Sequence, residues 1–271
     1  MSQVRLLIAV VAAALLIGLP QPQMARAADP LPTDRLVPGD YVRIVTNKGD
    51  LRAGPTGQHP AAYRMHKGEI AKVISEPVGC LPAPDPCARG WYEVHFREGP
   101  GLDWTGFIRR PKLAYTGLAG ARIGSKFERI VVVSLARQQA EVYENGELIL
   151  ISPVTTGRRH EPELITPTGK TPVTAKLSPY TFNSPWPEGH PFWYASITVD
   201  HAIRFRPGGY YLHPTPSRPR GGFGYGTDIP HVDPDGVTRD GSRGCINMPD
   251  WGALAMWDWI TVGTPVKVVE H

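Results

Sequence analysis

The stretch Ser242-Arg243-Gly244-Cys245-Ile246-Asn247-Met248 places one cysteine in a small, glycine-flanked turn just ahead of a segment that reads as a helix. A cysteine attacks a carbonyl as its thiolate, and a free cysteine is only a few per cent ionised at neutral pH. The charge of Arg243 would raise that fraction, and Gly244 would let backbone N–H groups approach a substrate oxygen. The stretch therefore indicates either a nucleophilic thiol with an oxyanion hole or a buried structural cysteine.

The pattern Ser-x-Gly-Cys-Ile-(Asn/Arg)-Met resembles the active-site signature of the YkuD-type L,D-transpeptidases, enzymes that cross-link peptidoglycan through a catalytic cysteine. That family usually has histidine in the place of Arg243. The resemblance implies that Cys245 is the nucleophile, supported by Ser242, Arg243, Gly244 and Asn247. Ser242 would orient the base, receive a substrate hydrogen bond or simply form the turn, and Asn247 would brace the cysteine loop.

A thiol nucleophile needs a partner that takes its proton and returns one to the leaving amine, and two histidines compete for this role. His213 ends the strand-like segment 209–212, where alternation would aim it into the site, whereas His231 lies in the loop 228–233. The family resemblance places the base histidine at the end of such a strand, which favours His213, with His231 as the alternative base. We interpret the long intervening segment 218–241 as an enlarged flap over the cleft.

The composition of the chain indicates a mainly β fold. The 271 residues allow one large or two small domains. Glycine and proline number 29 each, and helical periodicity is scarce, which favours strands and loops. The formal net charge is +4 and falls to +2 once residues 1–27 are removed, since these hold Arg5 and Arg26 and no acid. So mild a charge does not indicate a nucleic-acid partner, and it is compatible with an anionic cell wall.

The first 27 residues are typical of a signal peptide. Arg5 supplies a positive start, Leu6 to Leu19 is an apolar run, and Ala25-Arg26-Ala27 is an A-x-A cleavage site. The run is short for a membrane span and ends at Pro20, so we expect cleavage rather than a retained anchor. A proline-rich leader, 28–38, would then open an exported protein, periplasmic or extracellular and associated with the cell wall.

The three cysteines of the chain fall into a pair and a single thiol. Cys80 and Cys87 flank a proline-stiffened loop, where a disulfide would stabilise the fold by roughly 2–2.5 kcal/mol through loop closure. Two unpaired thiols there are the other interpretation, which an oxidising compartment disfavours. Cys245 is then the unpaired cysteine, and a nucleophilic cysteine has to be unpaired.

Residues 39–113 resemble a bacterial SH3-like domain. Five short strand-like runs follow one another with turns between them, at 40–45, 51–55, 67–74, 91–96 and 106–108. The resemblance implies a small barrel that either binds the cell wall or only positions the second domain, and these two roles stay open. Residues 114–126, rich in alanine, glycine, threonine and leucine, are interpreted as a linker.

The second domain, 127–271, resembles the YkuD domain in the order and wording of its segments. A β-branched strand at 128–135 precedes a hairpin at 138–151 that turns at Asn-Gly. A short helix at 249–260 and a last strand at 263–269 close the chain. We therefore predict a small SH3-like barrel followed by a YkuD-type β-sandwich catalytic domain with one short C-terminal helix.

The resemblance implies an exported L,D-transpeptidase that acts on tetrapeptide stems of peptidoglycan, releases D-Ala and forms cross-links through an acyl-enzyme. The same site would serve an L,D-carboxypeptidase if water resolved the thioester. A third interpretation is a non-catalytic wall-binding protein, because Arg243 and the long flap depart from the family pattern. No cofactor is expected, and no zinc-ligand spacing is present.

Overall fold

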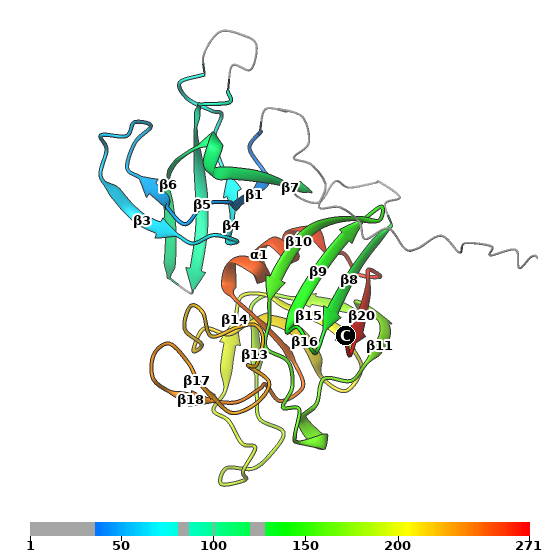
Figure 1. The fold of residues 1–271 in the computed structure, drawn as a ribbon. Helices are drawn as coiled ribbons and strands as arrows, with labels where there is room; N and C mark the ends of the chain where they lie inside the picture. The colour runs from blue at the N-terminus through cyan, green and yellow to red at the C-terminus, as the bar shows by residue number, and fades with distance from the viewer. Residues whose placement is uncertain (1–35, 81–86, 100, 120–127) are drawn as a thin grey trace, which may run out of the picture. The chain divides into compact units, whose positions relative to one another are not determined.

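The structure is a computed structural model that describes residues 36–80, 87–99, 101–119 and 128–271 (Figure 1). The expected signal peptide at 1–27 lies outside the described residues, as does most of the leader at 28–38. The described chain is mainly β, with one α-helix, which confirms the predicted fold class. No helix in this part of the chain is both long and apolar enough to cross a membrane.

The strands between residues 40 and 119 form one seven-stranded antiparallel sheet in the order β3-β2-β6-β5-β4-β1-β7. Side-chain alternation explains its long strand β5, in which Tyr92, Val94 and Phe96 are buried and the residues between them are half-buried. The strands are β1 (Asp40–Ile44), β2 (Gly49–Arg52), β3 (Ala61–Met65), β4 (Ile70–Val73), β5 (Trp91–Gly99), β6 (Leu102–Arg109) and β7 (Leu113–Ala119), with a 3-10 turn η1 (Arg110–Lys112) before the last.

The structure corrects the expected linker at 114–126. Residues 114–119 belong to β7, which pairs with β1, and the rest of that range lies outside the described residues. The hydroxyl of Thr116 also donates to the carbonyl of Tyr41 at 2.8 Å. A strand at the edge of a sheet needs only one pairing partner and no hydrophobic alternation, so its small-residue composition gave no strand signal.

The predicted disulfide between Cys80 and Cys87 is present. It joins the two ends of the loop 81–86, which lies outside the described residues. Cys245 is consequently the free cysteine of the chain.

The strands after residue 128 form two larger sheets and two short hairpins. One sheet has the order β10-β9-β8-β20-β11, and the other has the order β12-β15-β16-β19. The first contains β8 (Arg129–Ser134), β9 (Gln139–Glu144), β10 (Glu147–Pro153), β11 (Gly169–Pro172) and β20 (Pro265–Val269). The second contains β12 (Ala175–Leu177), β15 (Ala202–Arg206), β16 (Tyr210–Pro214) and β19 (Ile246–Met248). The two hairpins pair β13 (Tyr180–Phe182) with β14 (Ile197–Val199) and β17 (His231–Val232) with β18 (Thr238–Arg239), and a 3-10 turn η2 spans Pro162–Leu164.

The predicted hairpin at 138–151 is confirmed by the pairing of β9 with β10. Its turn residues Asn145 and Gly146 both have positive φ, 52° and 82°, which is the backbone conformation that an Asn-Gly turn supplies. The C-terminal strand β20 then pairs in parallel with β8, so the end of the domain is tied to its beginning.

The predicted helix is α1 (Asp250–Trp259), and it is buried over most of its circumference. It contacts β16 on one side and strands β4 and β5 of the first sheet on another. The carboxylate of Asp258 accepts hydrogen bonds from Tyr41 Oη at 2.6 Å and from Lys72 Nζ at 2.7 Å. The helix therefore shares its apolar surface between two sheets, which is why it carries tryptophans on more than one face.

Candidate active site

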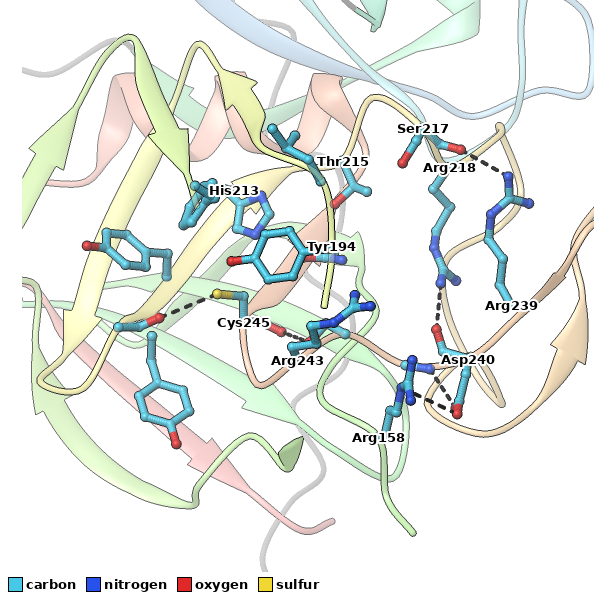
Figure 2. A pocket seen from close by; sticks show the side chains of 18 of the residues that line it. Arg158, Tyr194, His213, Thr215, Ser217, Arg218, Arg239, Asp240, Arg243 and Cys245 are labelled. Carbon is cyan, nitrogen blue, oxygen red and sulfur yellow. Dashed lines mark hydrogen bonds and ion pairs between the residues drawn. The ribbon is translucent and has the colours of Figure 1, made fainter. Parts of the chain in front are cut away.

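The pairing of β16 with β19 brings His213 and Cys245 to the same place. The two strands run parallel with His213 opposite Asn247, and Cys245 directly precedes β19. Both side chains line one cavity of about 860 Å³ (Figure 2). Residues 32 positions apart in the chain thus lie on neighbouring strands at the edge of one cavity.

His213 is held as a neutral imidazole with its proton on Nδ1. That nitrogen lies 2.7 Å from the carbonyl oxygen of Pro214, which can only accept, so Nδ1–H donates and Nε2 keeps its lone pair. The ring packs against Phe182 with 4.5 Å between ring centroids, and His213 is 8% exposed. Burial lowers the pKa of His213 from 6.5 to about 4. A neutral imidazole with a free Nε2 is what a general base requires.

The Cys245 thiol is protonated at neutral pH. Its Sγ–H donates to the carbonyl of Gly209 at 3.6 Å, and the side chain packs beside Tyr211. Burial raises the pKa of Cys245 to about 11, although the backbone N–H of Tyr211 acts in the opposite direction. The expectation that Arg243 would raise the thiolate fraction is wrong, because that guanidinium makes its contacts elsewhere.

Arg243 instead bonds to the segment that follows the β13 strand. Its Nε donates to the carbonyl of Phe192 at 2.6 Å, and one terminal nitrogen donates to the carbonyl of Trp193 at 3.2 Å. The guanidinium carbon lies 4.9 Å from the centre of the Tyr194 ring. Arg243 therefore holds this aromatic segment in place beside Cys245.

Ser242 forms the turn that presents Cys245. Its hydroxyl accepts the N–H of Gly244 at 3.1 Å and donates to the carbonyl of Cys245. Gly244 has a φ of +98°, and a Cβ at this position would lie 2.9 Å from the ring of Tyr210. The N–H of Gly244 is thus occupied by Ser242 and is not a free oxyanion-hole donor.

A buried threonine that the sequence analysis did not single out fastens the turn from behind. Thr166 Oγ1 accepts the N–H of Gly157 at 2.8 Å and donates to the carbonyl of Gly244 at 2.9 Å. Asn247 is braced through its backbone, which exchanges two hydrogen bonds with Thr155. The sequence signals for these two contacts were the segments Val-Thr-Thr-Gly and Thr-Pro-Thr-Gly. Both have the composition of turns and contain no catalytic residue type that would single them out.

The alternative base, His231, is engaged inside the flap. Its Nδ1 lies 2.7 Å from the carbonyl of Ile229, and its Nε2 lies 3.0 Å from the carboxylate of Asp233. It is absent from the residues that line the cavity of Cys245. The structure brings His213, and not His231, to that cavity.

Aromatic side chains line the cavity, and more of them come from strands than from the loop between β13 and β14. The loop between β13 and β14 contributes Trp186 and Tyr194 to the lining. The other aromatic lining residues are Tyr180, Phe182, Tyr210 and Tyr211, which come from β13 and β16. Side chains alternate between the two faces of β16. This alternation could have predicted Tyr211 as a lining residue, because Tyr211 lies on the face of β16 next to Cys245.

Comparison with known protein families gives a match to the part of the chain that holds the cavity. The family model of the L,D-transpeptidase catalytic domain, YkuD, matches residues 128–268. The comparison with curated proteins finds no match.

Solved structures of L,D-transpeptidases are similar to this chain at low identity. An Enterococcus faecium L,D-transpeptidase variant is 23% identical over 52% of this chain and 50% of its own, with a TM-score of 0.41. An L,D-transpeptidase from Mycobacterium smegmatis is 22% identical over 84% of this chain and 99% of its own, with a TM-score of 0.44. The catalytic domain of the E. faecium enzyme, solved as acylated by ertapenem, is 22% identical over 54% of this chain and all of its own, with a TM-score of 0.40.

The chain spans about half the length of the first two solved structures that it matches. The family model, in contrast, spans 128–268, from the first strand to the last of the domain that holds the cavity. Because this match covers more than half of the chain, the protein belongs to the YkuD family of L,D-transpeptidase catalytic domains.

Proposed function

We propose that the protein is an exported peptidoglycan L,D-transpeptidase that works through an acyl-enzyme on Cys245. One observation carries the proposal: a free thiol and a neutral imidazole line the same cavity, the imidazole on β16 and the thiol in the turn that leads into its parallel neighbour β19, within the residues that the family model matches. The disulfide between Cys80 and Cys87 supports export, since such bonds persist in oxidising compartments.

In the first half-reaction the thiol attacks the carbonyl between the L-centre of the diamino acid and the terminal D-Ala of a tetrapeptide stem. Nε2 of His213 takes the thiol proton as the Sγ–C bond forms. The C–N bond then breaks, the imidazolium gives its proton to the leaving amine, and D-Ala departs. A thioester remains on Cys245.

In the second half-reaction an amine of a neighbouring stem attacks the thioester. His213 accepts the proton of the amine, the C–S bond breaks, and the thiolate of Cys245 recovers a proton from the imidazolium. The product is an L,D cross-link, and both side chains return to their neutral forms. Pro214 has a positioning role here, because its carbonyl holds the imidazole in the tautomer that the base needs.

We propose in addition that the seven-stranded sheet of residues 40–119 is the SH3-like module expected from the sequence. Wall binding or positioning of the catalytic domain would be its role. Pull-down on purified sacculi with Cys245→Ala protein, in an excess of soluble tetrapeptide stem that occupies the catalytic cavity, separates the two, because a positioning module has no affinity for the wall of its own.

The activity is tested with mature protein, a tetrapeptide donor stem and an acceptor stem, followed by mass spectrometry. We expect a cross-linked product and one D-Ala released for each cross-link, none with Cys245→Ala, and a rate about 10²–10⁴-fold lower with His213→Gln. His231→Gln should retain the wild-type rate. Loss of activity in His231→Gln but not in His213→Gln would move the base to the flap.

The products also separate the alternative functions. Tripeptide and D-Ala without cross-links would show an L,D-carboxypeptidase, in which water resolves the same thioester. Retention on sacculi without any release of D-Ala would show a wall-binding protein.

A further inference from the structure

The cavity of Cys245 is richer in cationic than in anionic side chains. Its charged lining consists of Arg158, Arg218, Arg239 and Arg243 against Glu163 and Asp240. Carboxylates of the flap account for two of these arginines: Asp233 lies 3.9 Å from Arg218 and 3.1 Å from Arg239. Asp235 pairs with Arg239 as well. Arg158 shares its carboxylate partner, Asp240, with His160, and Arg243 has no carboxylate partner among the described residues.

Arg243 has no carboxylate partner among the residues that the structure describes. Its Nε and one terminal nitrogen are used by backbone carbonyls, and within the described chain its other terminal nitrogen, Nη1, makes no hydrogen bond. Burial lowers the pKa of Arg243, and the neighbouring charge of Arg158 lowers it further. A guanidinium that is half-buried beside a second guanidinium is stabilised by an anion.

Arg158 is placed next to Arg243 by the backbone. Gly157 forms a parallel bridge with Ser242, and the N–H of Arg158 donates to the carbonyl of Ser242 at 3.2 Å. Nε of Arg158 lies 3.5 Å from the carboxylate of Asp240, which His160 approaches to 3.3 Å as well. This Nε is buried and has no hydrogen-bond partner in the described part of the chain. Figure 2 shows Arg243 between Tyr194 and Arg158 in the lining of the pocket.

Two further polar atoms in the same lining are buried without a partner among the described residues. They are Oγ1 of Thr215 and Oδ1 of Asn247, and both residues line the cavity. Buried polar atoms in folded proteins are ordinarily hydrogen-bonded, so these two atoms in the lining of one cavity indicate a polar ligand. Asn247 Oδ1 can accept an N–H of that ligand, while Nη1 of Arg243 can donate to an oxygen.

We propose that Arg158 and Arg243 form a carboxylate-binding site that selects the donor stem and sets its position relative to Cys245. The inference rests on the proposed function, because it takes the ligand of the cavity to be a peptide stem. Two carboxylates of a stem have the required chemistry: the terminal carboxylate of the leaving D-Ala and, in stems whose diamino acid carries one, a second carboxylate on that side chain. Guanidinium pairs suit either one, since a planar fork of N–H donors matches a carboxylate with two hydrogen bonds.

Binding of synthetic stems to the inactive Cys245→Ala protein, measured by calorimetry, tests the site without any chemistry. Three tetrapeptides are compared: one with both carboxylates free, one amidated at the terminal carboxylate, and one amidated on the diamino-acid side chain. We expect one of the two amidations to weaken binding about ten- to hundredfold, the loss that removal of a charge-assisted hydrogen bond produces. The amidation that weakens binding identifies which carboxylate is recognised.

Arginine variants in the same background show whether these two side chains make the contact. Arg158→Gln and Arg243→Gln should each weaken binding of the stem with both carboxylates free about tenfold or more. Neither variant should much change the binding of the amidated stem that the Cys245→Ala protein binds weakly. Both variants must show the loss, because Arg243→Gln also releases the carbonyls of Phe192 and Trp193 and Arg158→Gln also releases the carboxylate of Asp240. Arg137→Gln, which removes an exposed charge paired with Glu141 on the other sheet, is the matched control and should retain full discrimination.

Equal binding of all three stems would overturn the inference, as would discrimination that survives both arginine variants or a failure of every stem to bind. The proposed function is decided separately by D-Ala release from wild-type protein. Discrimination by Cys245→Ala protein together with no release from the wild type would sustain the carboxylate site and reject the transpeptidase. Release of D-Ala by the wild type without discrimination between the stems would sustain the transpeptidase and reject the carboxylate site.

Discussion

Burial moves the pKa values of the two reacting side chains away from each other at the scale of single residues. The pKa of His213 falls to about 4 and that of Cys245 rises to about 11, so the resting pair is a neutral thiol and a neutral imidazole. Proton transfer must then accompany attack on the carbonyl, in contrast to a preformed thiolate–imidazolium pair. The low dielectric that opposes charge in the resting site also strengthens the contacts made as charge develops.

This neutral pair predicts the pH dependence of acylation. The base works only when deprotonated, and its lowered pKa keeps it so at every pH well above about 4. The second-order rate constant for acylation should therefore be flat from about pH 6 to pH 9 and fall only as the pH approaches 4. A bell-shaped profile limited by the ordinary values of 6.5 and 9.0 would show instead that burial shifts neither pKa, and would contradict the account of the two side chains.

At this scale the sequence predicted the thiol and its histidine, because both chemistries need particular residue types. It did not predict the contacts of Arg243, which was expected to act on Cys245. A charged side chain two positions from a thiol can point toward or away from it, and the choice depends on carbonyls that lie about 50 positions earlier, at Phe192 and Trp193.

The element that presents Cys245 is the turn 242–245, and its stability depends on a side chain from another segment. Thr166→Val keeps the shape of the side chain but leaves the N–H of Gly157 and the carbonyl of Gly244 buried without a partner. Each such group costs about 1–3 kcal/mol, so the variant should unfold with about 2–5 kcal/mol less free energy and acylate more slowly.

Urea unfolding and acylation rates measure this effect, with Thr168→Val as the control. Thr168 is exposed in the same segment, so its variant should change neither quantity by a measurable amount. Equal stability of the two variants would mean that Thr166 does not support the turn.

The disulfide is a second element whose effect can be measured alone. The loop that it closes spans seven positions, from Cys80 to Cys87, so the double variant Cys80→Ser/Cys87→Ser should lose about 2.5 kcal/mol of stability in denaturant unfolding. Its acylation rate should match the wild type, because neither residue lines the cavity. A loss of acylation in the native state of this variant would contradict that separation.

Strands with strong alternation or a firm turn signal were predictable at this scale, as β8, β9, β10 and β20 show. The strand β3 was missed because most of its residues are exposed and it pairs along one edge only. The strand β7 was interpreted as linker for the same reason. Edge strands gain their order from a partner strand, and a partner distant in sequence leaves no local pattern.

The whole molecule adds contacts that no segment predicts by itself. The helix α1 was predicted from its spacing, yet its acidic residue Asp258 receives hydrogen bonds from Tyr41 and Lys72, about 200 positions earlier. The cavity likewise combines β13, β16, the turn 242–245 and the flap. Composition and motif order were enough to predict the fold class and the family of the domain that follows residue 127. They were not enough to predict which aromatic and cationic side chains would share the cavity.

The central claim, a working acyl-enzyme site on Cys245, is tested most directly by the intact mass of the mature protein after incubation with a carbapenem. This β-lactam class generally acylates the cysteine of the family that the sequence resembles. We predict a stable one-to-one adduct on the peptide that contains Cys245, no adduct with Cys245→Ala and slower formation with His213→Ala. An adduct that persists in Cys245→Ala, or no adduct on the folded wild-type protein, would contradict the claim.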